Sequence, residues 1–373
     1  MATRGAELDA LSTKRLDRRT VGRSLRLGVL GLGYWGPNLL RAASELDSAR
    51  ITALCDSDPK PLARFGKRYH DAILTLDADE VFESEAVDAV LLATPIGSHY
   101  ELAKRALEAG KHVFVEKPLA RTSGQCQELI EVAKARGLIL MPGHTFLYSP
   151  PVVRVHEILT HRALGEIFFI TTVRVNLGIH QSGSSVIYDL APHDFSILRY
   201  WLGMPMFVRA IGRDLIEPGV WDVAFIDLGY ASGTLVRVEV SWLAPTKLRR
   251  TVIAGSTAMA IYDDTSNEQL RIYDCGVDLE DHHSFGEHRL AYRTGDIVSP
   301  RLNADEPLRL QLQDFVNSIE EGRPPRSHME LGADVVRLVE AAELSIRQSG
   351  AAIPLAADLG ERRVHDRRRS PRG

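Results

Sequence analysis

The sequence predicts an α/β fold of two domains: a doubly wound parallel sheet, then an α+β domain with a large, mainly antiparallel open sheet. Three observations support this prediction. Short apolar strands alternate with helical segments over about residues 25–145. After Pro150 and Pro151 the pattern changes to longer, half-exposed strands. The length of 373 residues also exceeds the usual size of one domain.

The N-terminal domain is predicted from strands that are apolar at nearly every position. A parallel sheet covered by helices on both faces needs such strands, because neither face meets water. The expected strands are 26–30, 51–55, 87–93, 111–115 and 138–141, and the expected helices are 38–46, 61–69, 100–109 and 123–136. We assign residues 26–146 to this domain.

The second domain is predicted from strands in which apolar and polar residues alternate, most plainly over residues 236–240. Such strands bury one face and leave the other free for a ligand or another subunit. The expected strands are 166–176, 206–213, 223–230, 234–242, 248–254 and 259–262, and the expected helices are 152–160, 188–200, 307–321 and 331–348. We assign residues 147–357 to a substrate-binding and oligomerisation domain.

The composition, 45% hydrophobic and 25% charged, is typical of a globular protein. A net charge of −4 gives no reason to expect nucleic acid or an anionic membrane as a partner. No apolar run reaches the roughly 20 residues of a membrane span. The three cysteines lack zinc-ligand spacing, so we expect no metal and a reducing, cytoplasmic location. The basic ends, residues 1–25 and 358–373, are expected to be disordered.

A glycine-rich turn, Gly31-Leu32-Gly33-Tyr34-Trp35-Gly36, follows the first expected strand and opens a helix. In that context the three glycines allow a tight turn, close backbone approach to a pyrophosphate and helix packing, as in Rossmann domains. Asp56 ends the second strand 20 residues after Gly36. A carboxylate there can bind ribose hydroxyls and would repel a 2′-phosphate, which favours NAD over NADP. The alternative is that Asp56 caps the next helix.

Further polar residues stand where the third and fourth strands end. Thr94, Pro95 and His99 lie on the expected cofactor edge, and a purely structural role for His99 is equally open. Lys117 follows Glu116 and precedes Pro118. A lysine in a partly desolvated crevice beside a nicotinamide can exchange a proton with a hydroxyl or ketone oxygen. Glu116 can orient this lysine or pair with it, and a plain surface ion pair is the alternative.

The second domain supplies Asp189 and His193, spaced i, i+4, so on one helix they share a face. A carboxylate beside an imidazole suits a proton relay or the binding of a diol. A helix cap with a core histidine is the alternative, and zinc would need a third ligand at matching spacing. Other polar groups near the domain junction are His144, Tyr148, Arg174, Asn176 and His180.

Together these motifs resemble the Gfo/Idh/MocA oxidoreductases over about residues 26–355. The resemblance is carried by the glycine turn, by Ala93-Thr94-Pro95, by Glu116-Lys117-Pro118 and by Asp189-x-x-x-His193. It implies NAD-dependent oxidation of a CH–OH group, with Lys117 as the proton-transfer residue, His193 near the carbinol and Asp189 assisting. The implied cofactor-binding residues are Gly31, Gly33, Tyr34, Trp35, Gly36, Asp56, Thr94, Pro95, His99, Glu116 and Lys117.

A narrower likeness rests on Gly33-Tyr34-Trp35-Gly36-Pro37-Asn38, the segment 143–150 and the segment 189–194. These look like the branch with UDP-N-acetylglucosamine and UDP-N-acetylglucosaminuronate 3-dehydrogenases, and imply C3 of a nucleotide-linked hexose as the reacting carbon. The chain departs from that branch at Ser149 and near His180. With the polar groups near the domain junction included, the candidate substrate-binding residues are Lys117, Tyr148, Arg174, Asn176, Asp189 and His193.

Two other functions stay open at this point: a dehydrogenase of a free sugar or cyclitol such as an inositol, and an NAD-binding sensor or scaffold without turnover. A basic or aromatic pocket beside the sugar site would favour a nucleotide sugar. The candidates for such a pocket are Arg174, Trp242, Lys247, Arg249 and Arg250. The resemblance and the exposed sheet face together imply a homodimer or homotetramer.

Overall fold

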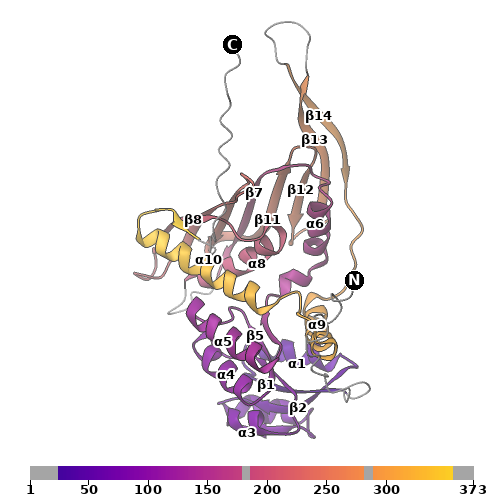
Figure 1. Cartoon of the computed structure of the whole chain (residues 1–373), viewed down its shortest axis with the longest axis vertical. Helices are drawn as coiled ribbons and strands as arrows, with labels where there is room; N and C mark the ends of the chain where they lie inside the picture. Colours follow the sequence, from indigo (N-terminus) through magenta and orange to yellow (C-terminus); the bar gives the residue numbers. More distant parts are fainter. Residues whose placement is uncertain (1–23, 179–184, 281–288, 356–373) are drawn as a thin grey trace, which may run out of the picture.

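The computed structural model describes residues 24–178, 185–280 and 289–355. The expectations of disorder at residues 1–25 and 358–373 therefore fall outside the described residues, except that Leu25 begins the first strand. His180 also lies outside them. Figure 1 shows two parts stacked along the long axis, with helix α10 (Met329–Arg347) lying between them.

The N-terminal domain contains the parallel sheet that the sequence predicts, with six strands in the order β3-β2-β1-β4-β5-β6. Its strands are β1 (Leu25–Leu30), β2 (Ala49–Cys55), β3 (Ile73–Thr75), β4 (Ala89–Leu92), β5 (His112–Glu116) and β6 (Leu140–Gly143). Its helices are α1 (Gly36–Ser44), α2 (Pro59–Gly66), α3 (Ala78–Glu83), α4 (Ile96–Glu108) and α5 (Ser123–Arg136). The sequence did not predict β3 and α3, because both are too short to show a period.

The second domain contains a nine-stranded sheet in the order β14-β13-β12-β11-β7-β10-β9-β8-β15. Neighbouring strands pair antiparallel except β7 and β10, which are parallel. The strands are β7 (Ile167–Leu177), β8 (Phe207–Arg213), β9 (Val223–Gly229), β10 (Leu235–Ser241), β11 (Leu243–Gly255), β12 (Met259–Asp263), β13 (Leu270–Glu280), β14 (Arg289–Val298) and β15 (Ile353–Pro354). The β13–β14 pair, which extends away from the rest of the sheet in Figure 1, was not predicted.

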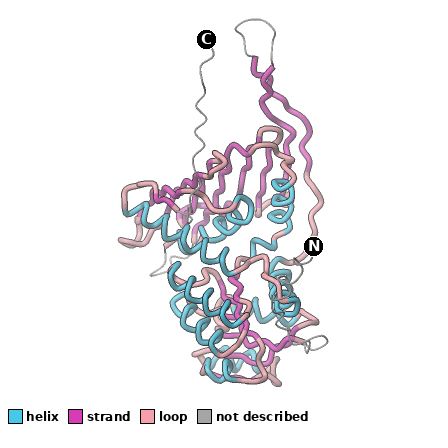
Figure 2. The backbone as a smooth tube through the Cα atoms, in the orientation of Figure 1, coloured by secondary structure: helices cyan, strands magenta, loops and turns pink. Residues whose placement is uncertain are grey.

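Helices cover one face of this sheet (Figure 2). The helices that contact the sheet are α7 (Val186–Asp189), α8 (Ala191–Leu202) and α10. Helix α6 (Pro150–Thr160) and the short η2 (Thr145–Tyr148) pack against α8, whereas α9 (Pro307–Glu321) packs on η2 and α1. The single helix expected over 188–200 is wrong, because the chain breaks at Leu190 into α7 and α8. Pro192 stands in the first turn of α8, where its missing N–H is tolerated and its ring prevents a continuous helix.

One cluster of buried hydrophobic residues spans both domains, and a second lies mainly in the first domain. Helix α9 packs on α1, and α10 contacts α5 and β6 of the first domain as well as α8 and β8 of the second. Phe114 of β5 meets Phe315 of α9 edge to face, with 5.9 Å between ring centroids. The C-terminal helices thus return to the first domain and fix the ends of β5 and β6 against the second. The division of the chain at residue 146 stays a prediction.

Candidate active site

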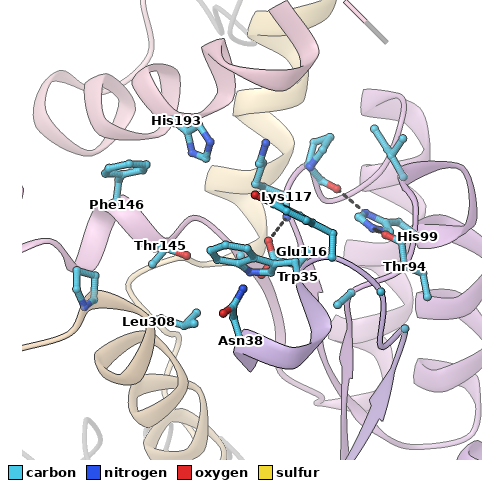
Figure 3. Close-up of a pocket in the computed structure, with 18 of the residues that line it drawn as sticks. Trp35, Asn38, Thr94, His99, Glu116, Lys117, Thr145, Phe146, His193 and Leu308 are labelled. Carbon is cyan, nitrogen blue, oxygen red and sulfur yellow. Dashed lines mark hydrogen bonds between the residues drawn. The ribbon is translucent and has the colours of Figure 1, made fainter. Parts of the chain in front are cut away.

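A cavity of about 1380 Å³ lies at the carboxyl ends of the parallel strands, where the second domain meets them. This is the edge at which open α/β sheets bind ligands. The predicted residues that line it are Gly31, Gly33, Tyr34, Trp35, Asp56, Thr94, Pro95, His99, Glu116, Lys117, Asp189 and His193. Figure 3 shows several of them converging from both domains.

The glycine turn has the geometry that a bound dinucleotide needs. Gly31 has φ of 87°, and a Cβ there would lie 2.7 Å from the Ala93 carbonyl oxygen. A Cβ on Gly36 would lie 1.9 Å from the carbonyl oxygen of Gly31, whereas Gly33 faces open space. Trp35 caps α1 without a side-chain hydrogen bond, and the first turn contains no acidic residue. Pro37 has no N–H, and the N–H of Asn38 donates to the Trp35 carbonyl at 2.9 Å, so the N–H of Gly36 is the first-turn donor that faces no such partner among the described residues and could bind a pyrophosphate.

Asp56 stands at the end of β2 with its carboxylate at the cavity. Oδ2 accepts a hydrogen bond from the N–H of Leu32 at 2.6 Å, and Oδ1 accepts one from Asp58 at 2.9 Å. Asp58, not Asp56, caps α2, because its side chain accepts the N–H of Lys60. The capping alternative for Asp56 is thus excluded, and the carboxylate is tied to the glycine turn.

His99 joins two of the strand ends. Its ring is 1% exposed, with Nδ1 2.8 Å from the Pro118 carbonyl oxygen and Nε2 2.8 Å from that of Thr94. Burial lowers the pKa of the imidazole. The histidine therefore braces the ends of β4 and β5, and its contact with a cofactor stays a prediction.

Glu116 is a buried carboxylic acid beside the cavity. Burial raises its pKa to about 7, although the charge of Lys117 and hydrogen bonds from the Lys117 N–H and the Trp35 side chain oppose the shift. The Lys117 N–H lies 3.2 Å from Oε2. A Cβ on Gly143 would approach this carboxylate within 3.0 Å, so only glycine fits there without displacement. Glu116 thus binds the backbone of Lys117 rather than its ammonium group.

The ammonium group of Lys117 reaches across to the second domain. Nζ donates to the main-chain oxygen of Asp189 at 2.9 Å and lies 3.4 Å from its Oδ1. Both side chains are partly buried, at 20% and 26% exposure. The indole Nε1 of Trp242 donates to Oδ2 of the same carboxylate at 3.1 Å. Asp189 is therefore held between the two domains.

His193 approaches the Lys117 side chain from the first turn of α8 (Figure 3). Burial lowers its pKa well below the usual value, and the charges of Lys117 and Arg174 add to the effect. Its ring meets Phe146 edge to face at 5.0 Å, and its Nδ1 has no hydrogen-bond partner among the described residues. The imidazole is therefore neutral at ordinary pH and has a ring nitrogen to offer a ligand.

His144, one of the polar residues expected near the domain junction, is a second neutral histidine close to Lys117. Burial lowers its pKa to about 3, and neither ring nitrogen has a partner in the part of the chain that the structure describes.

Four predicted residues do not line the cavity. Gly36 lies behind the turn. Tyr148 donates to Asp314 at 2.7 Å and accepts from the Ser327 N–H at 3.1 Å, so its hydroxyl is already bonded within the protein. Arg174 pairs with Asp194 at 2.6 Å, and both side chains are 4% exposed. Asn176 is half-buried on β7. The structure does not bring Tyr148, Arg174 or Asn176 together with Lys117.

Several lining residues were not predicted. Thr145 and Phe146 follow β6, whose carboxyl end opens onto the cavity, and this position is the signal that could have identified them. Others come from distant loops that no local pattern connects to the site, namely Asp264, Gln269 and residues 303–308. Of the five candidates for a nucleotide pocket, Arg249 lines the cavity and pairs with Asp264 at 3.0 Å.

Within the described residues, no group of three or more His, Cys, Asp or Glu side chains is placed to hold a metal ion. In the same part of the chain, no helix is both long enough and apolar enough to span a bilayer.

Comparison with known families assigns both halves of this arrangement. Residues 25–144 match the model of the Gfo/Idh/MocA oxidoreductase family, NAD-binding Rossmann fold, and residues 152–261 match the Gfo/Idh/MocA C-terminal domain. The chain belongs to the Gfo/Idh/MocA family. The resemblance seen in the sequence motifs is thereby confirmed, and the N-terminal domain is an NAD-binding domain.

The relatives that match are diverse. An inositol 2-dehydrogenase of Rhizobium meliloti is 28% identical over 55% of this chain and 63% of its own length. A 2,7-anhydro-N-acetylneuraminate hydratase of Escherichia coli is 28% identical over 58% of this chain and 61% of its own. The chain thus spans about three fifths of these relatives. The structure of UDP-N-acetylglucosamine 3-dehydrogenase GnnA from Acidithiobacillus ferrooxidans, 23% identical, has a similar fold with a TM-score of 0.72 over 87% of this chain and 98% of that one.

Proposed function

We propose that this protein is an NAD-dependent oxidoreductase that interconverts a secondary carbinol and a ketone on a sugar or cyclitol. The strongest support is that Lys117 of the first domain meets Asp189 and His193 of the second. They meet in the cavity that the glycine turn also lines. When bound, NAD supplies the hydride acceptor for this chemistry. The residues around it must bind the carbinol, orient it and remove its proton.

The residues present fit that cofactor. The backbone of Gly31 and Gly33 and the N-terminus of α1 would hold the pyrophosphate. Asp56 would bind the ribose hydroxyls, and its charge disfavours the 2′-phosphate of NADP. Trp35, Thr94 and Glu116 would line the nicotinamide end of the cavity.

Lys117 takes the hydroxyl proton in this proposal and returns it in the reverse direction. Asp189 positions the ammonium group through its main-chain oxygen and its carboxylate. His193, neutral and with Nδ1 unpartnered among the described residues, binds an adjacent hydroxyl of the substrate. Together they would stabilise the alkoxide that develops as the carbinol is oxidised.

The identity of the sugar is the finer part of the proposal. The motifs shared with the nucleotide-sugar branch favour C3 of a UDP-N-acetyl hexose, and a free cyclitol such as an inositol is the alternative. Arg249 in the cavity lining is the feature that favours a nucleotide diphosphate, but its charge is already opposed by Asp264. A screen of NADH formation with UDP-sugars, free sugars and inositols separates the two.

The catalytic assignment is tested by Lys117→Ala. We expect kcat to fall by about 10²-fold or more, because the proton acceptor is lost, with NADH binding nearly unchanged. Lys67→Ala, on the exposed surface after α2, is the matched control and should keep full activity. Near-normal turnover of Lys117→Ala on the substrate found in the screen would refute the role, and a complete absence of NADH formation by the wild type would favour the sensor alternative.

We also propose that the open face of the large sheet joins subunits into a homodimer or homotetramer. Strand register places Leu235 opposite Phe169, and Phe225 opposite Ile211, with all four side chains exposed. The exposed ion pair of Arg237 and Asp227 lies between the two apolar pairs. Exposed apolar side chains on one sheet face, bordered by charges, are typical of interaction surfaces. Sedimentation velocity would measure the assembly. The cytoplasmic location stays a prediction.

A further inference from the structure

We propose that Trp242 is a positioning residue, which holds the Asp189 carboxylate at a loose distance from the Lys117 ammonium group and so keeps this lysine able to release its proton. The inference rests on the proposed role of Lys117 and adds to it a residue of the second domain. Nothing in the sequence motifs singles out Trp242 for this task.

The geometry shows a carboxylate shared unequally between two donors. The Trp242 indole lies 3.1 Å from Oδ2 of Asp189, while Nζ of Lys117 lies 3.4 Å from Oδ1. Ammonium–carboxylate hydrogen bonds are usually about 2.7–2.9 Å long. The short contact of Nζ, at 2.9 Å, is instead to the main-chain oxygen of Asp189. The ion pair is therefore looser than its two charges would make it alone.

The indole is well fixed in place. Trp242 is 2% exposed and stands between β10 and β11. The main-chain N–H of Trp242 donates to the main-chain carbonyl of Asp222 at 3.0 Å, and the main-chain carbonyl of Trp242 accepts the N–H of Gly178 at 3.0 Å. A Cβ on Gly178 would lie 2.6 Å from Cδ1 of the indole, so the glycine at the end of β7 leaves the space that the ring occupies. The large sheet thus determines where the carboxylate of Asp189 points.

Other titratable groups also face Lys117, from every element packed around it. Glu116 on β5 accepts the main-chain N–H of Lys117 rather than its Nζ, which leaves Asp189 as the carboxylate that contacts the ammonium group within the described residues. The positive charge of Lys117 also contributes to the lowered pKa values of His99, His144 and His193. Burial keeps these histidines neutral, so they do not compete with Asp189 for the ammonium group.

Removal of the indole N–H has a definite consequence. The carboxylate of Asp189 loses its second donor and is free to turn its charge fully towards Lys117. A closer pair stabilises the ammonium form, so Lys117 releases its proton at higher pH. A merely structural tryptophan would not move that pH midpoint.

The test compares Trp242→Phe with Trp201→Phe. Trp201 is another buried tryptophan of the same domain, 7% exposed, whose indole donates to the Val152 carbonyl at 3.0 Å. Trace acetylation of the whole protein at a series of pH values, read by mass spectrometry of the Lys117 peptide, gives the pH at which half of the amine is reactive. We expect this midpoint to rise by about one pH unit in Trp242→Phe and to stay in place in Trp201→Phe.

Gly178→Ala provides a second variant that keeps the tryptophan and displaces it. Its midpoint should move in the same direction as that of Trp242→Phe, by a smaller amount. A midpoint that is unchanged or lower in both Trp242→Phe and Gly178→Ala overturns the inference. Because acetylation needs neither substrate nor turnover, the result is independent of whether the proposed dehydrogenase activity is correct.

Activity adds a second readout once a substrate is known. In the oxidation direction, kcat of Trp242→Phe should be reduced by about tenfold below neutral pH, and the deficit should shrink in alkaline buffer as Lys117 loses its proton. KM for NAD should not change, because Trp242 does not line the cavity. A deficit of equal size at every pH would contradict the positioning role.

Discussion

Replacement of Glu116 by glutamine should stabilise the protein, and more so at high pH. Burial raises the pKa of this carboxyl from 4.5 to about 7 in the folded state. In the range between these values the folded chain binds a proton that the unfolded chain has released. Stability therefore falls as pH rises through this range, because the folded state must either keep the proton or bury a charge. Glutamine is neutral throughout and removes the penalty.

The magnitude follows from the folded-state and unfolded-state pKa values. The penalty approaches about 3.4 kcal/mol above the folded-state pKa, because a tenfold change in an acid dissociation constant corresponds to about 1.36 kcal/mol. Between about pH 5 and about pH 8 it grows by about 2.5 kcal/mol at 25 °C. The Lys117 N–H that donates to Oε2 can equally donate to the amide oxygen of glutamine, so this bond survives the change.

Guanidinium unfolding of wild type and Glu116→Gln at the two pH values measures the effect. The difference in free energy of unfolding between the two proteins should grow by about 2.5 kcal/mol towards the alkaline side. Glu101→Gln, at an exposed position of α4, should show no such growth. A difference that stays the same at both pH values would show that the carboxyl is already ionised in the folded protein, and the reasoning from burial would be wrong.

Two further predictions separate binding from stability. Gly36→Ala should cost about 3 kcal/mol or more of stability, because its Cβ would lie 1.9 Å from a carbonyl oxygen. Gly33→Ala should change stability by less than about 1 kcal/mol and weaken NADH binding by about tenfold. Urea unfolding and fluorescence titration with NADH would measure the two effects, and equal loss of stability in both variants would contradict the assignment. Asp194→Asn should cost about 3–5 kcal/mol, because it leaves a buried arginine charge unpaired, while Asp227→Asn in an exposed pair should cost about 1 kcal/mol or less. Similar losses in the two aspartate variants would show that the buried arginine finds another partner.

The parallel domain could be predicted almost completely, since its strands are apolar throughout and its helices are long enough to show their period. The failures have local causes. Strand β3 has three residues, and α3 has six. The break between α7 and α8 depends on Pro192, and the prediction of one continuous helix over 188–200 did not take this proline into account. The β13–β14 pair was missed because its strands carry little regular alternation.

The glycine turn, Asp56 and Lys117 were predictable because parallel strands place their carboxyl ends at one edge. Tyr148 and Arg174 were assigned to the substrate as polar residues expected near the domain junction. In the structure the Tyr148 hydroxyl instead donates to Asp314, and Arg174 pairs with Asp194. Both partners lie far along the chain. Long-range polar pairing of this kind leaves no periodic signal, and for the same reason the contact between Trp242 and Asp189 could not be predicted.

The charges around Lys117 in the cavity favour this lysine over His193 or His144 as the group that takes the proton of the substrate hydroxyl. Burial holds His193 and His144 in the neutral form, the latter with a pKa of about 3. Neither can store a proton near neutral pH without a large cost. The ammonium group of Lys117, by contrast, is partly exposed, and its short hydrogen bond is to a neutral main-chain oxygen. The second domain therefore contributes more than substrate contacts, because the main-chain oxygen and carboxylate of Asp189 hold the ammonium group of the first domain's lysine in place.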